Sequence, residues 1–299
     1  MTTKLMPVNT TYEPFSLEPE YVAANQGFVS RVDLSGVGHF LDLACGTGTV
    51  SELLLEHSPD AHLNGVDYDP VQVDLSSERF RKLGYEVRNG FEVTEERVDA
   101  KSVLVFGEGS ATEVPFPDAA FDCVTIANAI HIIEDKQKLL ANVSRFLKPN
   151  GMFGFNSTFY SGSIPEGADR LYMDWLIFAT EHIVNKNKAL AAEGKRTIRR
   201  VRGTTRRAFT NRWYSPAEWT EFLAAVGLKV IDVNERRVEL SERSFTYVGA
   251  YGGLAEVLLS GYPVEEASEA LQAAAGPAMR ACGATVAPRN YLEIWATKV

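Results

Sequence analysis

Short apolar segments alternate with segments of helical periodicity through the first half of the chain. The apolar runs have the length of strands and lie at 39–48, 62–70, 101–111, 121–133 and 151–160. The residues that follow the first run, TVSELLLEHS, have the spacing of an amphipathic helix. Short buried strands that alternate with helices form parallel sheets with right-handed crossovers. The pattern therefore predicts an α/β fold.

The second half of the chain mixes helical segments with two further strands. A long helical stretch with a basic run occupies 165–209, and a helix at 215–228 opens with the capping box of Ser215 and Glu218 and closes at Gly227. The remaining segments are a strand at 228–240, an Ala-rich helical segment at 246–282 and a last strand at 290–299. For the Ala-rich segment, packing over a sheet edge and a role as a pocket wall are both open.

Composition narrows the class of protein. The 299 residues are 45% hydrophobic and 23% charged, with a formal net charge of −9, so we expect a soluble globular chain that does not bind nucleic acid. No run approaches the ~20 apolar residues that cross a bilayer, and the first residues lack the apolar core of a signal peptide. The scattered cysteines Cys45, Cys123 and Cys282 indicate reduced thiols. We therefore expect a cytoplasmic protein without a membrane partner; its oligomeric state is open.

The segment LDLACGTGTV at 41–50 is the sharpest chemical signal. Gly46 and Gly48 form a turn between a strand and a helix, where free backbone N–H groups can meet a ligand, although a tight turn without a ligand is the alternative. Asp67 follows 21 residues after Gly46, near the offset of a ribose-binding acid, and can equally be a helix N-cap. Ser51 stands where a dinucleotide motif has its third glycine, which favours a nucleoside without phosphates.

Four segments in order resemble the motifs of class I S-adenosylmethionine-dependent methyltransferases. They are DLACGTG, GVDYDP, GSATEVPFPDAAFDCV and VTIANAIHIIEDKQKLLANVSRFLKPNGMF. The likeness is to the ubiquinone/menaquinone-biosynthesis type and related small-molecule enzymes, covers about 35–160 and resumes weakly at WYSPAEWTEFLAAVGL. It implies a Rossmann-like fold: a mostly parallel seven-stranded sheet flanked by helices, with helical lid insertions. The expected parts are an N-terminal helical cap at 1–34, a cofactor-binding core at 35–160, a helical and basic lid at 161–212, and the end of the sheet at 213–299 with a helical insertion at 246–282.

The resemblance also implies cofactor-binding residues for S-adenosylmethionine. Asp42 and the turn of Ala44, Cys45, Gly46 and Gly48 would hold the methionine portion. The remaining assignments are Asp67 to the ribose hydroxyls, Tyr68 to adenine, Ser110 and Ala111 to the adenine edge, and Ala127 and Asn128 to the methionine amino group and the reaction centre. Ser110 replaces the acid that the family commonly has there, which leaves its own part open.

Methyl transfer requires that the acceptor be aligned with the S–CH₃ bond and that water be excluded. A hydroxyl or protonated amine acceptor also requires a base. His131 is the first candidate because its strand ends beside the cofactor in this fold, and His182 in the expected lid is the second. A structural role for a single histidine in an apolar run is the alternative. The spacing of His, Asp and Glu along the chain indicates no metal site.

Candidate substrate residues come from aromatic and basic positions. Tyr12, Tyr21, Trp175, Trp213 and Tyr247 would suit a flat apolar substrate, with core packing as the alternative. Three interpretations of the run KRTIRRVRGTTRR at 195–207 are open. It can form a solvated face or a clamp for an anionic substrate group, and an RNA-binding segment is the least favoured of the three. Arg199 and Arg202 share one face if this run is helical.

The hypothesis with most support is a methyltransferase for a small-molecule acceptor in specialised, natural-product or cofactor metabolism. Oxygen or nitrogen is favoured as the methylated atom, and carbon is possible. A non-catalytic S-adenosylmethionine-binding partner subunit is the alternative from another class. An RNA or protein methyltransferase is less favoured, because Ala127-Asn128-Ala129-Ile130 stands where enzymes acting on base amines carry their catalytic tetrad.

Overall fold

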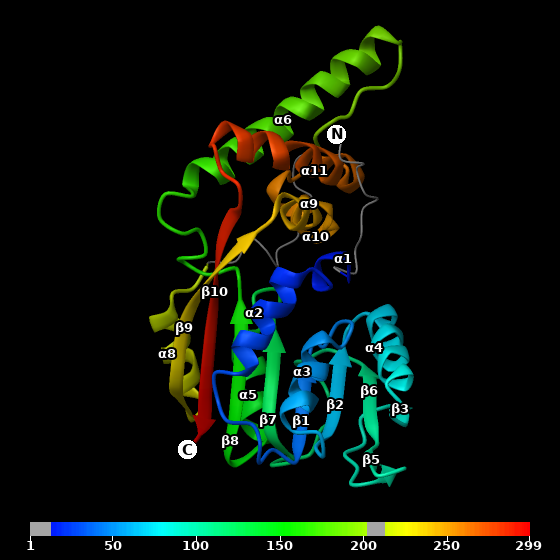
Figure 1. The fold of residues 1–299 in the computed structure, drawn as a ribbon, viewed down its shortest axis with the longest axis vertical. Helices are drawn as coiled ribbons and strands as arrows, with labels where there is room; N and C mark the ends of the chain where they lie inside the picture. The colour runs from blue at the N-terminus through cyan, green and yellow to red at the C-terminus, as the bar shows by residue number, and fades with distance from the viewer. Residues whose placement is uncertain (1–12, 202–212) are drawn as a thin grey trace. The chain divides into compact units, whose positions relative to one another are not determined.

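The computed structural model describes residues 13–201 and 213–299, which belong to two compact units (Figure 1). The sheet unit comprises Val22–Ser163, Trp213–Arg236 and Tyr291–Val299. The helical unit comprises Met1–Tyr21, Ile164–Arg212 and Arg237–Asn290, as far as these are described. The division into a cap, a core, a lid and a C-terminal part that the sequence suggests remains a prediction.

The central sheet has eight strands in the order β3-β6-β2-β1-β7-β8-β10-β9. The strands are β1 (His39–Leu43), β2 (His62–Asp67), β3 (Val87–Asn89), β6 (Leu104–Glu108), β7 (Phe121–Ala127), β8 (Leu147–Ser157), β9 (Leu228–Leu240) and β10 (Ala287–Lys298). The pairs from β3 to β8 are parallel, and β10 runs antiparallel to β8. Apart from this sheet, β4 (Arg97–Val98) and β5 (Lys101–Ser102) form a small antiparallel pair.

The Rossmann-like α/β architecture confirms the predicted fold class, but the prediction of seven strands is wrong. The eighth strand is β3, an edge strand of three residues that pairs parallel with β6. In β3 Val87 is buried, Arg88 half-buried and Asn89 exposed. A segment this short carries no alternating or apolar pattern, so the periodicity of the sequence cannot indicate it.

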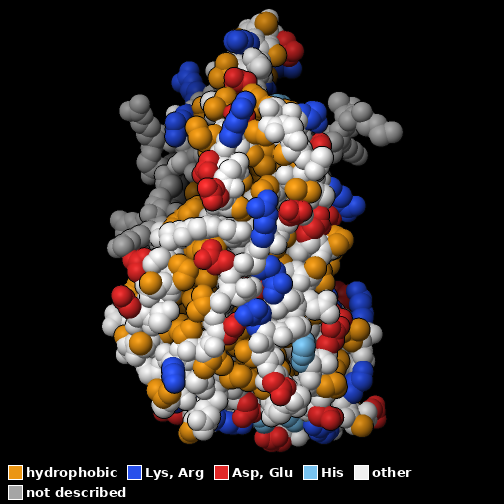
Figure 2. Space-filling model, turned by 60° about the vertical axis from the view of Figure 1, so that its left-hand side comes forward, with side chains coloured by type: hydrophobic (Ala, Val, Ile, Leu, Met, Phe, Trp, Pro, Cys, Tyr) orange, Lys and Arg blue, Asp and Glu red, His pale blue; other side chains and the backbone are white. Residues whose placement is uncertain are grey.

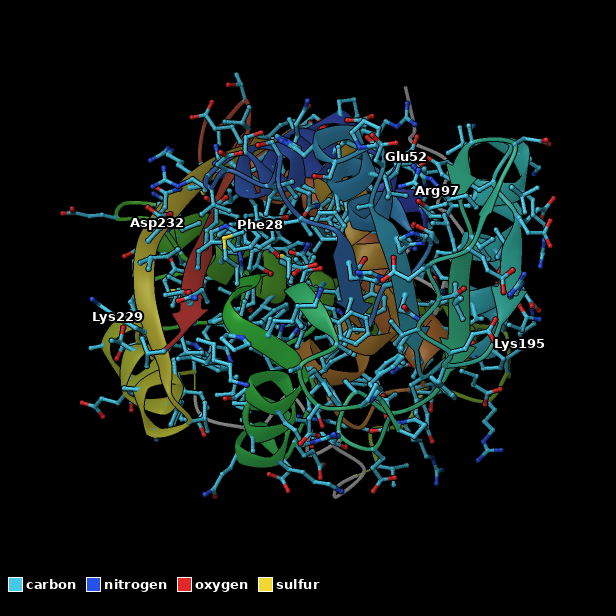
Figure 3. The ribbon with its side chains drawn as sticks, turned by 90° about the horizontal axis from the view of Figure 1, so that it is seen from below. Phe28, Glu52, Arg97, Lys195, Lys229 and Asp232 are labelled. Atoms are coloured by element: carbon cyan, nitrogen blue, oxygen red, sulfur yellow. The ribbon has the colours of Figure 1, made fainter. Side chains whose placement is uncertain are left out.

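Helices cover both faces of the sheet, and each face has its own apolar core. One core joins α5 (Lys136–Phe146) and α8 (Pro216–Ala225) to one face through Phe146, Trp219 and their neighbours. The other joins α2 (Pro19–Val29), α3 (Thr49–His57) and α4 (Pro70–Lys82) to the opposite face. There Phe28, labelled in Figure 3, stacks on Trp295 with ring centroids 4.9 Å apart.

Capping residues set the ends of the helices, at α8 as the sequence predicts. At α8, the Ser215 side chain accepts from the Glu218 N–H, and the Glu218 side chain accepts from the Ser215 N–H. Gly227, with φ 76, follows the helix and leads into β9. At α4 the N-cap is Asp69, which accepts from the Val71 N–H, so the alternative that Asp67 is the N-cap is wrong. These local signals are satisfied within a few residues, which makes them readable from the sequence.

The helical unit contains α1 (Glu13–Ser16), α6 (Asp169–Ala192), α9 (Glu242–Ala250), α10 (Gly252–Leu258) and α11 (Val264–Ala281). Trp175 on α6 contacts both α11 and α9. Its indole N–H donates to the Leu271 carbonyl oxygen at 2.7 Å, and its ring centroid lies 4.4 Å from that of Phe245. The chain leaves helical geometry after α6, so residues 195–201 are not the helix that a shared arginine face requires. Among the described helices, none combines the length and the apolar character needed to cross a bilayer.

Candidate functional site

The turn after β1 presents bare backbone where the sequence predicts the cofactor. Gly46 and Gly48 have φ 53 and 79, a left-handed conformation that favours glycine. A Cβ on Gly46 would meet nothing nearer than 3.9 Å, so the space beside this backbone is open. A Cβ on Gly48 would lie 3.0 Å from the Phe80 ring and 3.3 Å from Ser76. Gly46 thus leaves room for a ligand, and Gly48 allows α3 and α4 to pack closely.

Asp67 at the end of β2 connects this turn to the next strand. Its Oδ2 accepts from the Gly46 N–H at 2.8 Å and its Oδ1 from the Asp69 N–H at 3.0 Å. Burial raises the pKa of this carboxyl group, while the two backbone hydrogen bonds oppose the rise. The side chain is half-buried, and each of its oxygens accepts one of these hydrogen bonds, which leaves each with a further lone pair to accept another. The role in binding ribose and the role of fixing the turn are compatible.

Asp42 lies beneath the turn with only 1% of its surface exposed. Its carboxylate accepts from the hydroxyl of Ser51 at 2.6 Å and from that of Thr125 at 3.0 Å. Burial raises the pKa of Asp42 to about 6, although both hydroxyls lower it. Ser51, the residue that breaks the dinucleotide pattern, therefore serves as a hydrogen-bond donor to this buried carboxylate. Direct contact between Asp42 and the cofactor remains a prediction.

The remaining cofactor candidates lie at the same edge of the sheet. Tyr68 follows β2 and is 80% exposed, which leaves its ring accessible to stack on a ligand. Ser110 follows β6, and its hydroxyl lies 2.8 Å from that of Thr112. Ala111 is buried, Cys45 is a buried free thiol whose pKa burial raises, and Ala127 is half-buried at the end of β7. Parallel strands place these turns together because their carboxyl ends share one edge.

Three asparagines fix the end of β7. Asn128 has φ 54, and its N–H donates to the side-chain oxygen of Asn156 at 2.8 Å. The amides of Asn128 and Asn156 both donate to the side-chain oxygen of Asn25, at 3.1 and 2.9 Å. Asn25 and Asn156 are completely buried. The sequence gives no sign of this network because Asn25 lies on α2, far from the motif that carries Asn128.

His131 belongs to a short series of aromatic rings in the sheet unit. Its ring stacks on Phe159 with centroids 4.2 Å apart, and Phe159 meets Trp213 edge-on at 5.8 Å. The Nδ1 of His131 lies 3.2 Å from the Ser157 hydroxyl, which also accepts from the Phe159 N–H. The structure thus brings together the first catalytic candidate and one aromatic substrate candidate, Trp213, which is 41% exposed. No motif in the sequence indicates a role for Phe159, the ring between them.

The other candidates lie in the helical unit or outside the described residues. His182 faces Glu269 at 3.2 Å, and Lys186 binds the same carboxylate at 2.7 Å. Trp175 and Tyr21 are buried, Tyr247 is half-buried beneath Arg243, and Arg199 is exposed. Tyr12 and Arg202 fall outside the described residues. The face in Figure 2 shows acidic and basic side chains interspersed. The catalytic role of His182 and the substrate roles of the aromatic residues and arginines remain predictions.

Residues 41–155 match a family model described as a methyltransferase domain. A demethylmenaquinone methyltransferase of Thermus thermophilus is 35% identical over 111 residues, which are 37% of this chain and 43% of that relative. The similarity therefore spans less than half of the relative's length. The residues matched by the family model include the turn, the β2 acid and the end of β7 described above.

Solved structures show the same fold at low identity. The YcgJ protein of Bacillus subtilis has a TM-score of 0.56 at 17% identity, covering 92% of this chain and 98% of that one. The [4+2]-cyclase SpnF has a TM-score of 0.53 at 17% identity, covering 93% of this chain and 80% of that one. The fold alone does not determine the reaction, since a protein described as a cyclase shares it.

Proposed function

We propose that this protein is a class I S-adenosylmethionine-dependent methyltransferase that transfers a methyl group to a small-molecule acceptor, a proposal supported by the match of residues 41–155 to a methyltransferase domain model. The observation that carries the proposal is the position of the Asp67 carboxylate. Its two oxygens accept from Gly46 and Asp69, which fixes the acid beside a turn of open backbone. This arrangement suits a ribose diol next to a methionine tail and offers no third glycine for a pyrophosphate.

The residues present fit S-adenosylmethionine. The open space beside Gly46 leaves backbone accessible for the methionine portion, and Asp67 offers two acceptor oxygens to the ribose. Tyr68 and the turn of Ser110 and Ala111 would receive the adenine. The cofactor supplies an activated methyl group on a sulfonium, so the chain has to orient an acceptor and exclude water.

We assign proton removal to His131. Its Nδ1 is held near the Ser157 hydroxyl and its ring is supported by Phe159, so the imidazole has a defined orientation. The series His131, Phe159 and Trp213 suits a flat, apolar acceptor, as aromatic rings stack on such molecules. The similarity to a demethylmenaquinone methyltransferase favours a ring compound of this kind. An oxygen or nitrogen acceptor requires the base most directly.

Measuring cofactor affinity tests the proposed role of Asp67. Titration calorimetry with S-adenosylhomocysteine should show binding to the wild type and a roughly 30- to 150-fold weaker affinity for Asp67→Ala, which corresponds to about 2–3 kcal/mol of charge-assisted hydrogen bonding. Asp74→Ala, an exposed acid on α4, is the matched control and should bind like the wild type. Equal affinity for both variants would leave Asp67 as a structural residue only.

Transfer of a labelled methyl group tests the activity. The protein is incubated with methyl-labelled S-adenosylmethionine and a panel of quinols, phenols and aromatic amines, and products are identified by mass. Labelled product in an Asp67-dependent reaction supports the proposal. Tight cofactor binding without transfer to any acceptor class would favour the non-catalytic partner subunit.

A further inference from the structure

We propose that His39, His62 and Glu95 form a binding site for a divalent transition metal, best suited to Zn²⁺, at the amino-terminal ends of β1 and β2. One ligand atom from each residue lies within 4.8 Å of the others. Two imidazoles and a carboxylate form a donor set typical of zinc. Sequence spacing does not reveal the site, because the positions are far apart and the two histidines meet only through strand pairing.

The register of the sheet places the two histidines side by side. His39 and His62 are the first residues of β1 and β2 and are direct partners in the parallel pair. Their rings stack with centroids 5.1 Å apart and planes at 17°. Both residues are more than nine-tenths buried, with 7% and 5% of their surface exposed. The strands therefore hold both imidazoles in one place before any ligand binds.

The contacts of Glu95 have the spacing of ligands around one centre. Its Oε1 lies 3.2 Å from His39 Nε2, and its Oε2 lies 3.7 Å from His62 Nε2. Ligands at ~2.1 Å around a tetrahedral ion are roughly 3.4 Å apart, between these two distances. Within the described residues, the buried Nε2 of His39 has no hydrogen-bond partner despite the proximity of Glu95. An ion between the three side chains satisfies that nitrogen.

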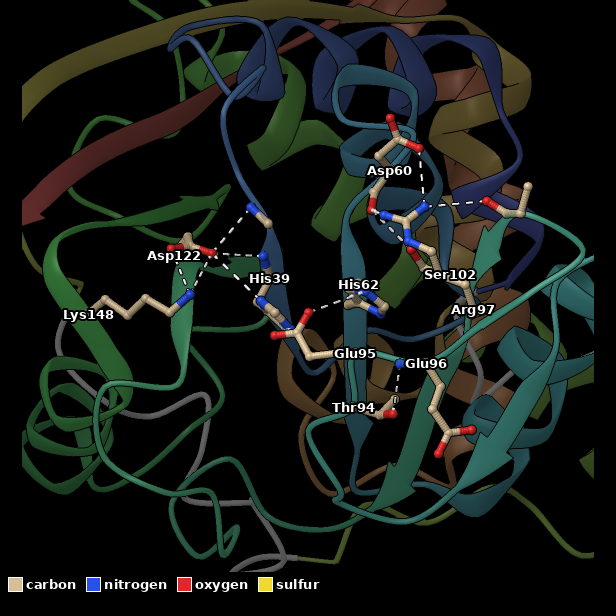
Figure 4. A network of polar contacts seen from close by, with 12 residues as sticks. His39, Asp60, His62, Thr94, Glu95, Glu96, Arg97, Ser102, Asp122 and Lys148 are labelled. Carbon is tan, nitrogen blue, oxygen red and sulfur yellow. Dashed lines mark hydrogen bonds and ion pairs between the residues drawn. The ribbon is translucent and has the colours of Figure 1, made fainter.

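Asp122 fixes the backbone of the first histidine and lies near its ring (Figure 4). Asp122 Oδ2 accepts from the backbone N–H of His39 at 2.9 Å and lies 3.9 Å from its Nδ1. Lys148 holds the other oxygen of Asp122 at 2.9 Å. At 3.9 Å the carboxylate makes no hydrogen bond to the ring, but it lies on the Nδ1 side, where a carboxylate commonly accompanies a metal-binding histidine and leaves Nε2 to the metal.

The loop that carries Glu95 is anchored although the side chain itself is 82% exposed. The Asn64 amide donates to the Glu92 carbonyl oxygen at 2.8 Å, and the Val103 N–H donates to that of Glu96 at 2.9 Å. Glu95 is thus tethered on both sides and open to solvent, which gives an ion a path of entry and leaves a position for water.

The site lies at the other end of β1 from the cofactor turn. His39 begins the strand and Leu43 ends it, four residues later, so the two ends are about 13 Å apart at ~3.3 Å per residue. An ion there does not touch the reacting groups. It connects β1, β2 and the loop of Glu95 through its three ligands, and it acts as a structural metal that stabilises the folded sheet unit.

Direct metal binding tests the inference without any cofactor or acceptor. Untagged full-length protein, freed of metal by a chelator, is titrated with Zn²⁺ and its metal content measured after gel filtration. The wild type should bind one equivalent and melt at a higher temperature with Zn²⁺ present. Glu95→Ala should bind at least about tenfold more weakly and lose the shift in melting temperature. Glu96→Ala, the exposed neighbour, is the matched control and should keep both.

Failure of methyl transfer has no bearing on these readouts, so the two proposals can fail separately. Equal Zn²⁺ affinity for the wild type and Glu95→Ala would overturn the site and leave the three side chains as an ion-pair cluster only. The same conclusion follows if the wild type shows no stoichiometric binding. His39→Gln is the second variant: it should lose Zn²⁺ binding while its circular dichroism spectrum without metal matches that of the wild type.

Discussion

Asn25 accepts a hydrogen bond from the side-chain amide of Asn128 at 3.1 Å, although 103 positions separate the two residues. The same oxygen accepts from the amide of Asn156 at 2.9 Å. One buried carbonyl oxygen on α2 therefore satisfies two amides at the carboxyl ends of β7 and β8. The backbone at Asn128, where the methionine end of the cofactor is predicted to bind, is held by a helix outside the family motifs.

Asn25→Ala removes the acceptor shared by these two amides. Depriving the buried amide of Asn156 and the half-buried amide of Asn128 of this acceptor should reduce the free energy of unfolding by about 1–3 kcal/mol. Urea denaturation measures the loss, and calorimetry should also show weaker binding of S-adenosylhomocysteine. Gln26→Ala, exposed on the same helix, is the control; alanine gains helix propensity at both positions, and more where it replaces asparagine. Similar stability of the two variants would contradict a role for the asparagine network.

The pH dependence of stability should report the burial of Asp42. Its pKa of about 6 in the folded protein exceeds the ~3.9 of an unfolded chain, so the folded state binds more protons between these values. The free energy of unfolding therefore falls as pH rises from ~4 to ~6, by about 3 kcal/mol from this group alone. Asp42→Asn removes this contribution.

Urea denaturation at pH 4, 5, 6 and 7 compares the two proteins. The stability of the wild type relative to Asp42→Asn should decline across that window and then level off. Titrating groups remote from this site affect both proteins alike, so the difference reports Asp42 together with its repulsion by Asp67. Asp74→Asn, an exposed acid, should follow the wild type. Parallel curves for the wild type and Asp42→Asn would show that the carboxyl group does not titrate in this range.

Local signals allowed much of the fold to be predicted from the sequence. The strand at 228–240 matches β9, and the capping box of Ser215 and Glu218 forms as expected. Both depend on residues close together along the chain. Ser51 departs from a glycine motif, which the sequence shows, but its hydrogen bond to Asp42 depends on how the turn folds back onto β1.

Contacts between distant segments could not be predicted in this way. The helical unit assembles described residues from 13–21, 164–201 and 237–290, whereas the sequence pattern treats these as separate insertions. His39 and His62 meet because β1 and β2 pair in one particular register. Asn25 reaches Asn156 only after α2 packs on the sheet. Neither periodicity nor motif spacing contains that information, because each depends on tertiary packing.

Gly48→Ala should separate backbone strain from crowding at the cofactor turn. Gly48 has φ 79 and Gly84 has φ 80, so alanine is equally strained at both positions. At Gly48 the new methyl group also meets Phe80 at 3.0 Å, whereas at Gly84 the nearest atom is the end of Lys101 at 3.4 Å. We expect Gly48→Ala to lose about 1–3 kcal/mol more stability than Gly84→Ala in urea denaturation. Equal losses would show that α3 and α4 do not need the glycine to pack.

His131→Gln tests the proposed base in the reaction itself. With an acceptor identified by labelled transfer, kcat should fall by about 10²- to 10⁴-fold, the usual contribution of general base catalysis. The affinity for S-adenosylhomocysteine should stay within about threefold of the wild type, since the proposed role concerns the acceptor and leaves cofactor binding alone. Ser157→Ala keeps the imidazole but removes its neighbour at 3.2 Å, so it should lower kcat by a smaller factor. Unchanged kcat in His131→Gln would assign the histidine to packing against Phe159 and leave alignment and water exclusion as the chain's whole contribution to the reaction.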